Sequence, residues 1–193
     1  MKRVTVFCGS SLGTGDQFAL HAAALGKALA QNNLELVYGG ANVGLMGVLA
    51  DSVLLAGGKV TGVLPYFLQG KEIAHEGLTE LILVESMHER KLKMHELCDG
   101  VIALPGGYGT LEEFFEMLTW AQLGLHQKPI ALLNVNGFYD DLVAMIQTMV
   151  DKGFLKEINQ RMLLVSNSIE DMLDAMDHYQ APAVGKWITK DKV

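Results

Sequence analysis

The chain has 193 residues, a formal net charge of −7 and hydrophobic side chains at 50% of its positions. This length fits one domain that buries a sizeable core, and an acidic balance without a basic block argues against broad nucleic-acid binding. No apolar run approaches the roughly 20 residues that span a bilayer, which argues against a membrane-embedded protein.

The chain opens with MKRVTVFCGS, whose apolar part is too short for a signal peptide and leads directly into a glycine turn. We therefore interpret residues 4–8 as a first strand. The two cysteines, Cys8 and Cys98, form neither a CxxC pair nor a metal-binding spacing. A reduced, cytoplasmic setting is the simplest interpretation of these cysteines.

Short β-branched runs alternate with longer helical patterns along the rest of the chain. The expected strands are residues 4–8, 34–39, 59–65, 81–85, 100–105, 129–135 and 162–166. The expected helices are residues 16–32, 44–57, 86–98, 109–124, 138–152 and 168–178. Strands that are apolar on both faces favour a parallel sheet covered on both sides. The sequence predicts an α/β fold, a single doubly wound, Rossmann-like parallel sheet with helices on both faces, over residues 1–180, followed by a tail at 181–193.

Three of the expected strands end in loops rich in glycine. These loops read CGSSLGTG after the first strand, YGGANVGLMG after the second and PGGYGT after the fifth. In doubly wound folds, ligands bind beyond the carboxyl ends of the strands. Taken alone, the loop after the second strand is also explained by a tight turn and close helix packing, and the loop after the first by an ordinary turn with a serine N-cap. Three such loops on one edge predict a ligand of nucleotide or phosphate size.

The loop PGGYGT at residues 105–110 leads into a helix and has the composition of a phosphate site. Gly106, Gly107 and Gly109 leave backbone amides accessible at the positive end of the helix dipole, and Thr110 adds a hydroxyl. No lysine follows these glycines, so a triphosphate with magnesium fits poorly. The first strand ends without GxGxxG, which weakens a dinucleotide site. A monophosphate is favoured, with no metal ion and no cofactor.

Two acidic residues, Glu112 and Glu113, follow the glycines within the first turns of the same helix. The helix dipole alone favours acids near a helix start, so each of them is also explained without a ligand. Glu113 shares a helix face with Thr110 and Trp120. This spacing suits a carboxylate that meets a ribose beside bound phosphate, with Trp120 or a methionine beside the base.

The segment ESMHERKLKMHELCD at residues 85–99 is the second informative helix. Met87, Arg90, Lys91 and Met94 lie on one stripe of it. Adjacent cations at the centre of a core stripe are costly to bury, so Arg90 and Lys91 are expected to face an anionic ligand while the methionines pack on a flat group. A solvated basic patch with half-buried stems is the alternative.

The pair of motifs MHERK (87–91) and PGGYGTLEE (105–113) resembles the LOG ("Lonely Guy") family of cytokinin riboside 5′-monophosphate phosphoribohydrolases. The segments CGSS, VYGG…GLMG, TWAQLGLHQKP and LLNVNGFYDDL are similar to family segments as well. The resemblance implies hydrolysis of the N-glycosidic bond of an adenosine-type 5′-monophosphate, which releases the base, often N6-modified, and ribose 5-phosphate. It also implies at least a homodimer.

The resemblance assigns roles to individual residues. Arg90 and Glu113 match the residues that carry catalysis in the family. The family's substrate contacts match Glu72, Arg90, Lys91, Gly106, Gly107, Tyr108, Gly109, Thr110, Leu111, Glu112 and Thr119. Glu113 is expected to stabilise a cationic ribosyl transition state, while Arg90 anchors the nucleotide.

Two other functions stay open at this point. A nucleotide-binding carrier or sensor would need the glycines but not Glu113. An NAD(P)-linked oxidoreductase would need the dinucleotide fingerprint that the sequence lacks. The apolar run FFEMLTWAQLGL at residues 114–125 adds independent support for an oligomer whose contact lies close to the site.

Overall fold

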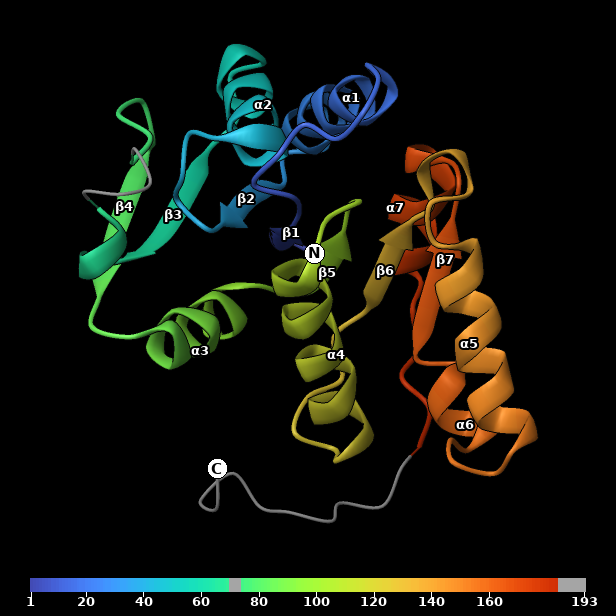
Figure 1. Ribbon diagram of the computed structural model, residues 1–193. Helices are drawn as coiled ribbons and strands as arrows, with labels where there is room; N and C mark the ends of the chain where they lie inside the picture. Colours follow the sequence, from blue (N-terminus) through green and yellow to red (C-terminus); the bar gives the residue numbers. More distant parts are fainter. Residues whose placement is uncertain (70–73, 184–193) are drawn as a thin grey trace.

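A computed structural model describes residues 1–69 and 74–183 of the chain. In this part of the chain, seven strands form one sheet in the order β4-β3-β2-β1-β5-β6-β7, and each neighbouring pair is parallel (Figure 1). The strands are β1 (Arg3–Phe7), β2 (Glu35–Tyr38), β3 (Val60–Pro65), β4 (Glu80–Val84), β5 (Gly100–Ala103), β6 (Ile130–Leu133) and β7 (Leu163–Ser166). The predicted doubly wound α/β fold is confirmed.

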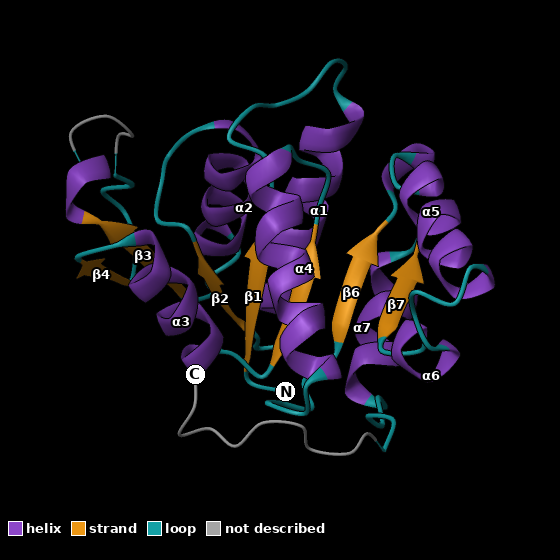
Figure 2. Ribbon diagram, turned by 60° about the horizontal axis from the view of Figure 1, so that its bottom comes forward, coloured by secondary structure: helices purple, strands orange, loops and turns teal. Residues whose placement is uncertain are grey.

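Helices cover both faces of this sheet (Figure 2). They are α1 (Gln17–Gln31), α2 (Gly44–Leu55), α3 (Met87–Leu97), α4 (Tyr108–Gln122), α5 (Asp140–Asp151), α6 (Glu157–Gln160) and α7 (Ile169–Asp177), with 3₁₀ turns η1 (Tyr66–Leu68) and η2 (Val135–Gly137). Among the described residues, no helix is long and apolar enough to cross a membrane.

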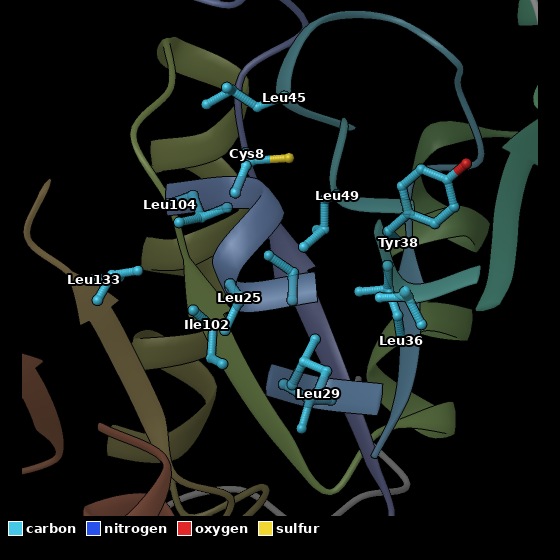
Figure 3. Close-up of a cluster of buried hydrophobic side chains, with 14 of the residues drawn as sticks. Cys8, Leu25, Leu29, Leu36, Tyr38, Leu45, Leu49, Ile102, Leu104 and Leu133 are labelled. Atoms are coloured by element: carbon cyan, nitrogen blue, oxygen red, sulfur yellow. The ribbon is translucent and has the colours of Figure 1, made fainter. Parts of the chain in front are cut away.

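Two buried clusters, one on each face, hold the layers together. The first joins Leu36 and Ile102 of the sheet to Leu25 of α1 and Leu49 of α2 (Figure 3). The second lies on the opposite face and contains residues of α3 and α4, among them Phe114. Full burial of a leucine or phenylalanine side chain stabilises a fold by about 1.5–3 kcal/mol. The central strands are buried on both faces, which explains why their sequences are continuously apolar rather than alternating.

The strand order changes direction between β1 and β5, which is the switch point of the sheet. From β1 the chain builds outward through β2 to β4 on one side, and it then crosses to β5 and continues to β7 on the other. The carboxyl ends of β1, β2 and β5 therefore lie side by side at the switch point, where doubly wound folds bind their ligands. These are the three ends that carry the glycine-rich loops.

The observed elements differ from the expected ones at a few ends. The helix expected over residues 138–152 begins at Asp140, because Tyr139, with φ −100° and ψ 7°, is its N-cap residue and lies outside the helical conformation. The short helix α6 was not expected from the sequence. Most of the tail expected at 181–193 lies outside the described residues, so the domain boundary at residue 180 stays a prediction.

Candidate active site

The three glycine-rich loops pack on one another through their backbones. The Gly9 amide donates to the Pro105 carbonyl at 3.1 Å, and the Leu45 amide donates to the Gly9 carbonyl at 3.0 Å. Gly44 lies so close to Ser10 that an added Cβ would stand 2.2 Å from the Ser10 carbonyl carbon. The loops after β1, β2 and β5 thus form one continuous surface at the switch point.

The glycines of the loop after β5 serve two different purposes. A Cβ on Gly106 would lie 2.2 Å from the Thr110 hydroxyl and 2.9 Å from the Gly9 amide, so this glycine is required by packing. A Cβ on Gly107 or on Gly109 would meet no heavy atom of the described residues within 4 Å. Packing therefore does not require these two glycines, which leave open space above the start of α4.

The first turn of α4 presents its backbone amides at that open space. Gly107 is the N-cap residue, and no side chain among the described residues caps the helix there. Uncapped amides at a helix start carry partial positive charge and bind phosphate groups. The other residues of the turn have separate environments: Tyr108 is 95% exposed, Thr110 is buried beneath Gly106, and Leu111 packs against the second core cluster.

Helix α3 begins with a reciprocal cap that fixes where Arg90 leaves the backbone. The Ser86 hydroxyl accepts a hydrogen bond from the Glu89 amide at 3.1 Å, and the Glu89 carboxylate accepts one from the Glu85 amide at 2.8 Å. This pattern is close to the capping box that marks helix starts. Arg90 stands one residue after it, on the face that meets the sheet.

Arg90 is 8% exposed, and backbone carbonyls at the sheet edge hold its guanidinium. Its Nε donates to the Val63 carbonyl at 3.1 Å, and its Nη2 donates to the Gly39 carbonyl at 3.0 Å. Gly39 must be glycine for this contact, because an added Cβ would lie 1.9 Å from Nη2. Neither carbonyl could have been identified from the sequence, since backbone acceptors carry no residue signature.

Glu113 faces Arg90 from α4. Its Oε1 lies 4.0 Å from Arg90 Nη1, and its side chain is 14% exposed. Burial raises the pKa of Glu113 to about 7, against the opposing effect of the Arg90 charge. Burial also raises the pKa of the Cys8 thiol, and the charge of Glu113 raises it further. The structure thus brings together the two residues expected to carry catalysis.

Lys91 is paired with protein carboxylates. Its Nζ lies 2.5 Å from Glu112 Oε1 and 3.0 Å from Glu116 Oε1, both on α4. These ion pairs connect α3 to α4 alongside the pair formed by Arg90 and Glu113. A ligand that contacts Lys91 or Glu112 therefore binds a side chain that is already part of an ion pair.

Other residues expected at the ligand have the following surroundings. Thr119 is exposed, and its hydroxyl donates to the Phe115 carbonyl at 2.7 Å. Trp120 packs edge-on against His95 with ring centroids 5.1 Å apart. Met94 is buried in the second core cluster, so the expectation that it packs on a ligand is wrong. Glu72 lies outside the described residues.

A wide groove of about 1020 Å³ runs between α3 and α4. Residues of α3, of α4 and of the segment 125–129 line it, among them Leu92, Trp120 and Leu125. Leu92 is 47% exposed, which is high for an apolar side chain beside other apolar groups. Lys91 also lines the groove, so it adjoins the site.

Comparison with known proteins decides the family. The family model described as "Possible lysine decarboxylase" matches residues 46–176. The chain is 49% identical over 176 residues to the cytokinin riboside 5′-monophosphate phosphoribohydrolase of Rhodococcoides fascians, covering 91% of this chain and 89% of that protein. An Arabidopsis thaliana protein of the same name, LOG7, is 43% identical over 179 residues, with 93% and 82% covered. The chain belongs to the LOG family.

Solved structures show how widely this fold of the LOG family is shared. A molybdenum cofactor binding protein from Rippkaea orientalis superposes with a TM-score of 0.68 at 22% identity, over 92% of this chain and 96% of that chain. At this identity the likeness concerns the fold alone. A shared fold does not separate an enzyme from a binding protein, so the function must be argued from the site.

Proposed function

We propose that this LOG-family chain hydrolyses the N-glycosidic bond of an adenosine-type 5′-monophosphate, releasing the free base and ribose 5-phosphate. The observation that carries this proposal is the buried pair of Arg90 and Glu113, 4.0 Å apart. The pair lies next to the glycine-rich loop at residues 105–110, which we call the phosphate-type loop. A carrier needs the loop but has no use for a buried carboxylate with a raised pKa. The names of the relatives support the same activity.

The 5′-phosphate would bind at the amides of the first turn of α4, above Gly107 and Gly109. Binding there fixes the nucleotide through a group remote from the reacting carbon. The ribose is thereby oriented by a group that takes no part in breaking the glycosidic bond. The sugar then lies beside Glu113. The Lys91 ion pairs with Glu112 and Glu116 hold α3 and α4 at a fixed spacing around it.

Cleavage would pass through a ribosyl cation. The bond from C1′ to the base nitrogen breaks with its electron pair going to the base, and a water oxygen bonds to C1′. The Glu113 carboxylate stabilises the developing positive charge and orients that water. A proton released by the water is balanced by one taken up by the base.

Arg90 anchors the nucleotide in this step, as the resemblance implies, and it also holds Glu113 in place. Two of its three guanidinium nitrogens are already engaged by the carbonyls of Val63 and Gly39, and the third faces the carboxylate. A guanidinium stays protonated in proteins, so Arg90 contributes fixed charge and hydrogen bonds rather than a proton. Losing one such preorganised group costs on the order of 10²–10³ in rate.

The first test is product formation from a panel of nucleotides. AMP and N6-prenylated AMP are incubated with the protein, and free base and ribose 5-phosphate are measured by chromatography and mass spectrometry. Glu113→Gln should lower kcat on the order of 10²–10³-fold while nucleotide affinity is largely kept, because the loop amides are untouched. Glu157→Gln, at an exposed glutamate of α6 that does not line the groove between α3 and α4, is the matched control. Tight nucleotide binding without product in the wild-type protein would favour a carrier.

We further infer that the chain forms a homodimer through the groove between α3 and α4. The exposed Leu92 and the neighbouring Trp120 and Leu125 give this face an apolar centre, and charged residues surround it. Such a contact adjoins Lys91 and therefore the proposed active site.

The two cysteines, both free and buried, support a reducing compartment such as the cytoplasm.

A further inference from the structure

The segment after β6, residues 134–140, forms a tight corner that the proposed reaction leaves without a role. The Asn134 side chain accepts a hydrogen bond from the Tyr139 amide at 2.7 Å and donates one to Asp140 Oδ1 at 2.7 Å. Asn136 and Gly137 turn the chain with left-handed φ values of 50° and 74°. A Cβ on Gly137 would lie 2.5 Å from Asp140 Oδ2. The corner is thus held by hydrogen bonds of the Asn134 side chain and by a turn at Asn136 and Gly137.

Tyr139 extends from the corner to the end of the neighbouring strand. Its side chain is buried, with only 1% of the residue exposed, and its hydroxyl donates to the Leu104 carbonyl at 2.6 Å. Burial raises the pKa of Tyr139, so the hydroxyl stays a donor. Leu104 follows the last residue of β5, and the Leu104 amide in turn donates to the Phe7 carbonyl of β1. The hydroxyl therefore holds the point where the chain leaves the sheet to enter the loop Pro105–Gly106–Gly107.

The corner contacts a second glycine-rich loop through Phe138. The Phe138 ring packs edge-on against Phe18, with centroids 5.8 Å apart, and against Tyr139 at 4.9 Å. Phe18 lies at the start of α1 and covers Gly13 of the loop after β1, where an added Cβ would stand 2.8 Å from the Phe18 ring. One corner therefore touches both the strand end below the phosphate-type loop and the helix that follows the loop after β1.

We propose that residues 134–140 are a brace for the phosphate-binding loop and that Tyr139 is a positioning residue of the reaction. The Tyr139 hydroxyl fixes the Leu104 carbonyl, and with it the direction in which the amides of Gly107 and Gly109 point. Since those amides would bind the phosphate, the proposal rests on the proposed function of the loop. The alternative is that the hydroxyl contributes to stability alone.

Tyr139→Phe is the decisive variant, because it keeps the ring and its packing and removes only the donor. We expect its affinity for AMP and for inorganic phosphate to fall about tenfold, which corresponds to about 1.4 kcal/mol and to one buried hydrogen bond. Affinity for adenosine, which has no phosphate, should stay within twofold of the wild type. Isothermal titration calorimetry measures all three ligands, with Glu113→Gln present in both compared proteins so that AMP is bound but scarcely turned over during the titration.

A stability control separates positioning from general weakening. Ile146→Val removes one methylene from a buried side chain of α5 and does not alter the hydroxyl contact. It should lower the melting temperature without changing the affinity for AMP or phosphate. If Tyr139→Phe lowers the melting temperature but binds AMP and phosphate as tightly as the wild type, the positioning role is overturned. An equal loss for AMP and adenosine overturns it as well.

A further readout does not depend on the proposed reaction. In the ligand-free protein, Tyr139→Phe should shift the backbone amide resonances of Gly106, Gly107 and Gly109 in a ¹H–¹⁵N spectrum and leave that of Gly57, at the far end of α2, in place. Unchanged resonances for the three loop glycines would overturn the brace even if the nucleotide is cleaved. Shifted resonances in a protein that binds no nucleotide would keep the brace and remove the proposed function.

Discussion

At the scale of single residues, the buried carboxyl of Glu113 determines how the site should respond to pH. Burial raises its pKa to about 7, and Arg90 opposes that shift. A carboxyl with a raised pKa is protonated below that value and becomes a carboxylate only above it. Because the proposed mechanism needs the carboxylate, the active fraction of the enzyme rises as pH increases.

We therefore expect kcat/KM for AMP to rise with pH along a limb whose midpoint lies near pH 7. The pH dependence of kcat/KM reports groups of the free enzyme and free substrate, and the substrate phosphate ionises near pH 6. The two are separated by Glu113→Gln, whose residual activity should lose the limb near 7 and keep the one near 6. A limb near 7 that persists in Glu113→Gln would show that another group is titrating.

The residue scale also shows what a sequence can and cannot reveal about this site. Arg90 and Glu113 stand in motifs, and the structure places them together as expected. The Gly39 carbonyl that holds Arg90 comes from a residue 51 positions away in the sequence, and the contact depends on backbone geometry. Trp120 shares a helix stripe with Glu113, and its ring packs edge-on against His95 of α3, a contact that the stripe alone does not reveal.

At the scale of elements, the start of α4 separates glycines that the fold needs from glycines that a ligand needs. Gly109 lies inside the first turn of the helix, where alanine is favoured over glycine by about 1 kcal/mol. An added methyl group there meets nothing among the described residues within 4 Å. The fold alone would therefore prefer alanine at this position.

Gly109→Ala should raise the melting temperature by a few degrees and lower the affinity for AMP at least tenfold, because the methyl group occupies the space proposed for the phosphate. Gly106→Ala is the contrasting variant and should lower the melting temperature, since its Cβ would collide with Thr110 and Gly9. Differential scanning calorimetry and nucleotide titration measure both effects. Unchanged AMP affinity in Gly109→Ala would place the phosphate elsewhere.

Element positions were largely predictable, and their ends were not. The apolar runs and the alternation of periods located all seven strands of the described chain, because a buried parallel strand is continuously apolar. The sequence pattern places the start of α5 two residues early, since Phe138 has helical dihedral angles but Tyr139, the N-cap residue, does not. Backbone conformations of this kind depend on tertiary contacts such as those of Asn134.

At the scale of the whole molecule, the groove between α3 and α4 predicts the assembly. Light scattering at micromolar concentration should give a mass of at least twice 21.0 kDa for the wild-type protein. Leu92→Glu places a charge at the apolar centre of the groove and should reduce the mass to that of one chain. Leu55→Glu, equally apolar and 88% exposed on α2, should leave the mass unchanged. A wild-type monomer, or a Leu92→Glu dimer, would contradict the proposed interface.

The switch point between β1 and β5 has a consequence for how the enzyme is completed along its chain. Arg90 is held by the carbonyls of Gly39 and Val63, which follow β2 and lie within β3, whereas Glu113 comes from the helix after β5. When residues 1–98 have been synthesised, the nascent chain contains the segments of β1 to β4 and Arg90. It does not yet contain Glu113, which faces Arg90 in the folded protein. The remaining residues carry the glutamate and the phosphate-type loop, but nothing to hold the arginine. The two halves of the reaction centre are therefore synthesised one after the other, and the centre exists only once β5 has paired with β1.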